Sequence, residues 1–190
     1  MPGAAGPGTI SPLRYSRVAI WFHWLIAALI ITNLLLGFLH DDVSRPVRSW
    51  MMFLHKSTGF VVLGLSLARL GWRLGHRPPP FDPLLRPWEA KLARGTHWLF
   101  YALMVVIPLS GWLLVSSSDR ATSLFGLVEI PPLPVSRADA AHDLWEELHG
   151  ILGYAVVALI ALHLAGAAKH HLQGHRHLIG RMAPWLYRGT

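Results

Sequence analysis

The chain has 190 residues, of which 53% are hydrophobic and only 14% are charged, a balance typical of an integral membrane protein with one domain. It contains no cysteine, which excludes structural disulfides, thiolate zinc sites, iron–sulfur clusters and covalently attached c-type haem. A net charge of +7 is compatible with nucleic-acid binding, but the positions of the charged residues along the chain indicate another origin for this charge.

Residues 1–14 are rich in Gly, Pro and Ala and are predicted to form a disordered cytoplasmic leader. The first uncharged apolar run follows at about residues 18–39 and contains His23. This run is too long for a signal peptide, and no small-residue cleavage site follows it. We therefore expect a first transmembrane helix, with His40 at its end.

The second apolar stretch, at about residues 50–72, is the weakest, because only residues 57–68 are free of charge. Lys56 and Arg69 stand near its two ends, where long side chains can reach the membrane interface. His55 precedes Lys56. The length still predicts a second transmembrane helix.

The third stretch, at about residues 96–118, opens next to His97 and contains Pro108, which is expected to kink the helix. Neighbouring helices can satisfy the backbone groups that a membrane proline leaves free. The loop at residues 119–141 contains an apolar turn and three prolines, a pattern compatible both with a segment on the outer membrane surface and with one wall of a quinone pocket.

The fourth stretch, at about residues 143–169, carries His149 and His163, which are 14 residues apart. On a helix this spacing advances ~21 Å and returns to within roughly 40° of the starting face. One helix thus offers an imidazole in each half of the membrane. The fold class is predicted to be all-α, an integral membrane four-helix bundle over residues 15–171, with a basic cytoplasmic tail at 172–190. The tail contains four histidines that resemble a metal site, but the interleaved cations favour an interfacial segment; they are His170, His171, His175 and His177.

The distribution of charge predicts the orientation in the membrane. The N-terminal segment, the end of the second stretch with the loop that follows it, and the end of the fourth stretch with the C-terminal tail hold 12 of the 17 Lys and Arg but only two of the ten acids. The positive-inside rule then places both termini in the cytoplasm. The net positive charge marks the inner face and gives no indication of nucleic-acid binding.

This orientation gives each histidine a depth. His55 and His149 fall in the outer half, and His23 and His163 fall in the inner half. Two other histidines compete for these places: His40 for the place of His55, and His97 for that of His23. Intramembrane histidines also serve as interhelical hydrogen-bonding residues. Four of them at two matched depths favour metal ligation instead, and haem iron takes axial histidines.

Several pieces together resemble the bacterial cytochrome b561 family. They are Tyr15-Ser16-Arg17 with residues 20–24, residues 52–55 with Gly59, Gly95-Thr96-His97, residues 108–111, and His149 with Gly153-Tyr154 ahead of His163. The resemblance extends from Tyr15 to about His171. It implies a four-helix bundle that holds two haem b groups, with His55 and His149 as iron ligands of the outer haem and His23 and His163 as those of the inner haem.

The resemblance also implies superoxide oxidation at the outer haem and reduction of ubiquinone to ubiquinol. In that setting Lys56, with Arg45 and Arg48 nearby, is predicted to steer superoxide to the outer haem. Arg69 is predicted to hold propionates of the inner haem, in preference to Arg14 and Arg17. Two alternatives stay open. One is an electron-conduit cytochrome b subunit that docks a redox protein partner, as in membrane hydrogenases and formate dehydrogenases. The other is a haem-free transport or metal-sensing bundle.

Overall fold

A computed structural model describes residues 14–80, 85–118 and 122–187 of the chain. The first thirteen residues of the predicted leader lie outside this described part. Four long helices dominate, and the elements in chain order are α1 (Arg17–Phe38), η1 (His40–Asp42), α2 (Arg45–Gly75), α3 (Pro87–Ser117), β1 (Thr122–Leu124), β2 (Val128–Ile130), α4 (Asp139–Leu172), α5 (Arg176–Gly180) and η2 (Pro184–Tyr187). Each long helix is apolar and long enough to cross a membrane, so the predicted fold class is confirmed.

The long helices extend beyond the apolar runs that predicted them. α2 starts five residues before the expected position 50, and α3 starts at Pro87 rather than near residue 96. Proline suits the first turn of a helix because its missing N–H is not needed there. The side chain of Glu89 also caps α3 by accepting a hydrogen bond from the backbone N–H of Arg86 at 3.0 Å. The added turns are polar, which places them outside the hydrocarbon layer.

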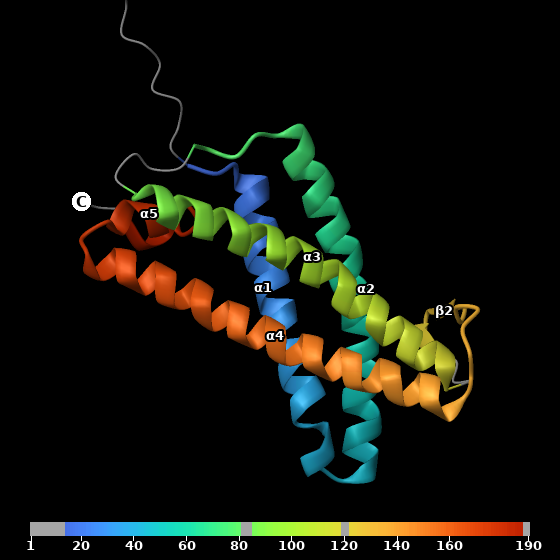
Figure 1. Ribbon diagram of the computed structural model, residues 1–190. Coiled ribbons are helices and arrows are strands. Elements are labelled where there is room, and N and C mark those ends of the chain that lie inside the picture. The colour runs from blue at the N-terminus through green and yellow to red at the C-terminus, as the bar shows by residue number, and fades with distance from the viewer. Residues whose placement is uncertain (1–13, 81–84, 119–121, 188–190) are drawn as a thin grey trace, which may run out of the picture.

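The helices pair as two antiparallel hairpins. Figure 1 shows α1 beside α2 and α3 beside α4, with one pair crossing the other. α3 runs through Pro108 to Ser117 without a break in the helix. The apolar centre lies where the pairs meet, around Ile26, Tyr101 and Met104, and continues to a second cluster of Leu103, Val156 and Leu159.

Small polar side chains are buried between the helices, while large apolar ones face outward. The buried set consists of Ser57, Ser66, Thr96, Ser110, Ser116 and Ser117 in the long helices. Outward-facing residues include Trp21, Leu35 and Leu164. Small residues let helices approach closely where lipid removes the hydrophobic drive for association. This distribution is the one expected for a bundle surrounded by lipid.

The loop after α3 forms a short β-hairpin in which Thr122 pairs with Ile130 and Leu124 with Val128. Phe125 and Gly126 both have positive φ, of 51° and 73°, as the tight turn of a hairpin requires. The hairpin is fixed to α2, because the Ser57 hydroxyl donates to the carbonyl of Ser123 at 3.2 Å and accepts from the N–H of Phe125 at 3.0 Å.

The segment after α4 folds back onto the start of α1. The indole N–H of Trp24 donates to the carbonyl of Met182 at 2.9 Å, and the rings of Trp24 and Trp185 lie 5.5 Å apart. Ala183 between them is buried. The residues predicted as a basic tail thus form α5 and η2 and contact the end of the bundle where α1 begins.

Candidate cofactor sites

Two imidazoles from different hairpins meet at the level that the sequence predicts to be the outer one, and the names outer and inner are used below in that predicted sense. The ring centres of His55 on α2 and His149 on α4 are 6.1 Å apart, with the ring planes at 87°. The two helices lie in different hairpins, so a group held between these rings would link the hairpins. This is the pairing that depth predicted.

Each outer histidine has its Nδ1 engaged by a neighbouring helix. The Nδ1 of His55 lies 2.9 Å from the carbonyl oxygen of Asn33, and the Nδ1 of His149 lies 2.9 Å from the Ser110 hydroxyl oxygen. That hydroxyl donates its own proton to the carbonyl of Ile107 at 2.8 Å, so it accepts from the imidazole. Such contacts assign the proton to Nδ1 and leave Nε2 with the lone pair that a metal needs.

Glycines stand directly against both outer imidazoles. A Cβ atom at Gly37 on α1 would lie 2.9 Å from Cε1 of His55, and one at Gly111 on α3 would lie 3.0 Å from Cε1 of His149. Distances this short leave no room for a larger residue unless the ring moves. By contrast, added Cβ atoms at Gly59 and Gly153 would meet other helices at ordinary distances. Gly59 and Gly153 belong to the motifs that carry the family resemblance. Gly37 is not among those motifs, so the sequence did not indicate its contact with a candidate ligand.

Three imidazoles gather at the inner level. The ring centre of His163 on α4 lies 6.3 Å from that of His23 on α1 and 5.9 Å from that of His97 on α3. The structure therefore brings His23 and His163, the predicted pair, together. It also places His97, the competitor of His23, at a similar distance from His163. Phe100 closes this site, with its ring centre 5.6 Å from that of His163.

Arg69 reaches into the inner site from α2. Its Nη2 lies 3.5 Å from Nδ1 of His23, and its guanidinium carbon lies 5.5 Å from the ring centre of Tyr101. Arg73 also lies over the Tyr101 ring, at 5.4 Å. Intramembrane arginines are costly and are kept for function. The position next to His23 would suit a partner for an anionic group of a bound cofactor, and the propionate role of Arg69 stays a prediction.

The spacing of each predicted pair fits two axial ligands of one metal ion. A metal–imidazole bond is about 2.0 Å long and the ring centre lies about 1.1 Å beyond the nitrogen, so opposed rings should be ~6.2 Å apart. The observed distances are 6.1 and 6.3 Å. In the described part of the chain, no group of three or more His, Cys, Asp or Glu could hold an ion. Haem iron, whose four equatorial ligands come from the porphyrin, fits such two-histidine sites.

The outer face carries less free positive charge than its sequence suggested. Arg48 lies 3.1 Å from a carboxylate oxygen of Asp41, so this ion pair balances its charge. The competitor His40 is held in the same turn, where its Nδ1 donates to the carbonyl of Gly37 at 2.9 Å. Lys56 stays partly buried beside His55, and Arg45 is exposed.

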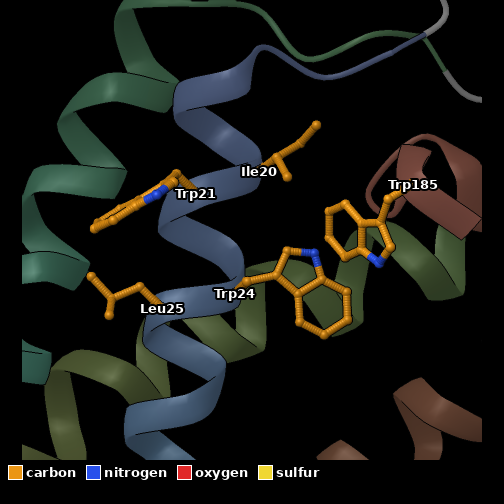
Figure 2. A pocket seen from close by; sticks show the side chains of 5 residues that line it. All are labelled: Ile20, Trp21, Trp24, Leu25 and Trp185. Carbon is orange, nitrogen blue, oxygen red and sulfur yellow. The ribbon is translucent and has the colours of Figure 1, made fainter.

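A shallow groove of about 460 Å³ crosses the outward face of α1 at the inner level. Figure 2 shows Trp21 and Leu25 on one side of the helix, and Trp24 facing Trp185 on the other. Apolar and indole side chains line it, so a lipid-soluble molecule suits it better than a polar one. Trp24 connects the groove to the inner site, because its ring centre lies 5.3 Å from that of His23.

The histidines at the C-terminal end of α4 and just after it lie close together, with the ring centres of His170 and His175 separated by 6.1 Å. Next to them the ammonium of Lys169 lies 2.6 Å from the carboxylate of Glu89 and ties α4 to α3. The interfacial interpretation of this segment stays a prediction.

Comparisons with known proteins agree with this geometry. The family model described as prokaryotic cytochrome b561 matches residues 14–185. A relative named cytochrome b561 homolog 2, from Escherichia coli strain K12, is 31% identical over 86% of this chain and 87% of its own length. Another, named probable superoxide oxidase CybB, from Yersinia pestis, is 29% identical over 90% of this chain and 96% of its own. A cytochrome b562 from Cereibacter sphaeroides is 31% identical over about half of the chain.

Proposed function

The chain belongs to the prokaryotic cytochrome b561 family, and from this premise we propose that it is a dihaem superoxide:ubiquinone oxidoreductase of the bacterial inner membrane. Membership supports a membrane electron-transport protein that binds haem b. The specific activity is suggested by the relative named a probable superoxide oxidase. In the overall reaction, two superoxide anions each lose one electron and leave as oxygen, while one ubiquinone gains two electrons and two protons.

The observation that carries the proposal is the pair of histidine sites at two levels. The ring-centre distances of 6.1 and 6.3 Å at these sites both match axial ligation. Four ligands, His55 with His149 and His23 with His163, would hold one haem b in each half of the membrane. Haem b would supply a one-electron carrier at each site. Two carriers in series suit a route between an outer donor and the quinone pool.

The residues around the sites support outer-sphere electron transfer. Two histidines on one iron leave no position open for oxygen or superoxide to bind the metal. Asn33 and Ser110 hold the two outer imidazoles in the tautomer that ligates. At the inner site, Arg69 would exchange its contact with His23 for a propionate. With both termini in the cytoplasm, the inner site faces the cytoplasmic leaflet.

Lys56 is expected to draw superoxide to the outer site. We predict that Lys56→Gln slows haem reduction by a superoxide pulse roughly three- to tenfold at low salt, because the local field concentrates a small anion. Added salt should slow the unchanged protein and narrow this difference, because it screens the field. Stopped-flow spectroscopy of the haem bands measures both rates.

The matched control is Lys56→Arg, which keeps the charge and should keep the rate. Haem content must be equal in the three proteins. A rate that neither salt nor Lys56→Gln changes would remove Lys56 from the superoxide reaction.

The groove over α1 offers ubiquinone a place beside the inner site. The groove opens toward lipid, where ubiquinone dissolves. Trp24 lines the groove, and its ring also contacts the ring of His23. Electrons that reach the inner level would then have a short path out of the bundle. We therefore assign the quinone-reducing step to this face of α1.

Trp24→Leu is predicted to raise the KM for a short-chain ubiquinone roughly two- to tenfold, since an aromatic contact is worth ~0.5–1.5 kcal/mol. The rate of haem reduction by superoxide should not change. Steady-state quinone reduction under a constant superoxide supply gives the KM. Trp50→Leu, at the opposite end of the bundle, is the control; an equal effect there would show that the groove is not the quinone site.

The proposed function is tested most directly with purified protein. Superoxide should reduce the haems in stopped flow, and added ubiquinone should reoxidise them. Haems that superoxide leaves oxidised, together with a redox protein that stays bound through purification, would instead support an electron-conduit subunit.

A further inference from the structure

The inner site contains one more imidazole than two axial positions require. His97 on α3 and His23 on α1 both lie next to His163, with ring centres at 5.9 and 6.3 Å. Each distance is close to the ~6.2 Å expected for opposed ligands of one ion. His163 is common to the two possible pairs, so the choice lies between α1 and α3 for its partner.

The outer site differs, because its competitor is held elsewhere. His40 donates from Nδ1 to the carbonyl of Gly37, and its Nε2 lies 3.5 Å from a carboxylate oxygen of Asp41. The Nδ1 of His40 is thus held in its own turn, and its Nε2 faces a carboxylate. His55 and His149 also have Nδ1 fixed by a hydrogen-bond acceptor, but their ring centres lie 6.1 Å apart, the separation expected for opposed ligands. The outer pair is therefore unique, and the inner pair is not.

Because of its contact with Arg69, His23 has a different tautomer from the outer ligands. A guanidinium can only donate, so its contact at 3.5 Å requires Nδ1 of His23 to accept. The proton of a neutral His23 then lies on Nε2, the nitrogen that would have to bind iron. His23 becomes a ligand through Nε2 only when Arg69 gives up this contact.

We propose that His97 is an alternative axial ligand of the inner haem, able to take the place of His23 opposite His163. This inference rests on the proposed function, in which the inner site holds haem b. It gives the inner haem two coordination states, one anchored to α1 and one to α3. Contact between Arg69 and His23 favours the state on α3, and withdrawal of Arg69 favours the state on α1.

The test compares His23→Ala, His97→Ala and the double variant, with His55→Ala as the matched control at the outer site, where the third imidazole, His40, is held by Gly37 and faces Asp41. Pyridine haemochrome titration measures haem content, and electron paramagnetic resonance identifies low-spin iron with two histidines. We expect each inner single variant to keep both haems low-spin, with a shifted inner signal in His23→Ala. The double variant should lose the inner haem, and His55→Ala should lose the outer one.

Loss of the inner haem in His23→Ala alone would overturn the inference, and so would its loss in His97→Ala alone. The outer haem reports folding in each inner variant; if His23→Ala loses both haems, His23→Leu, which fills the space, replaces it and is read in the same way. An unchanged protein without two haems would contradict the proposed function itself, an outcome distinct from either of these.

Discussion

His163→Ala is expected to halve the haem content of the purified protein, and His55→Ala is expected to do the same at the other level. His163 is shared by both inner pairs whose ring spacing fits axial ligation, so its loss removes both of them. The nearest competitor of His55 is held by Gly37 and Asp41. An iron that loses one of two axial ligands is bound far more weakly. Haem content by pyridine haemochrome gives the stoichiometry, and low-temperature spectra identify the haem that remains.

The two variants should also fail at different steps. His55→Ala should abolish reduction by superoxide, while His163→Ala should keep that reduction and lose the transfer to ubiquinone. His142→Ala, which removes a histidine of α4 outside both sites, serves as the control with full haem content. If the two substitutions remove the same spectral component, the assignment of pairs to levels is wrong.

Gly37→Val is expected to remove the outer haem from most of the protein while the inner haem stays. The added Cβ would lie 2.9 Å from the imidazole of His55, and that ring is already held by the carbonyl of Asn33. The ring must therefore leave the position opposite His149, and a misplaced ligand cannot complete the axial pair. Redox titration of the two haem signals would show the loss of one component.

The matched control is Gly150→Val, because Gly150 neighbours a ligand in sequence but a Cβ there meets nothing within 4 Å. It puts the same β-branched residue into a transmembrane helix, so any effect of helix propensity is common to both variants. Equal loss of the outer haem in both proteins would rule out close approach to His55 as the cause. A normal haem content in Gly37→Val would do the same.

The outer site joins the two helix hairpins, and the inner site joins them when His23 is the partner of His163. The outer pair links α2 to α4, and the inner pair links α4 to α1 or α3. α4 carries a proposed ligand at each level, His149 and His163. Haem binding would therefore contribute to the stability of the bundle, since a cofactor bound only by the folded state stabilises it. The ion pair between Lys169 and Glu89 further links α4 to α3.

The sequence by itself determined the four membrane helices and the level of each histidine. A helix that crosses hydrocarbon needs about 20 apolar residues, and its fixed rise and rotation place His149 and His163 in opposite halves of the membrane. These properties depend only on the order of residues within one segment. For the same reason the sequence could match His55 with His149 by depth.

Only the tertiary structure decided which groups touch the imidazoles. The carbonyl of Asn33, the hydroxyl of Ser110 and the faces of Gly37 and Gly111 reach the outer pair because of how each helix is rotated against its neighbours. Depth alone did not separate His97 from His23, and the structure places both beside His163. Rotation and crossing of helices result from packing between distant segments, and no pattern within a single segment specifies them.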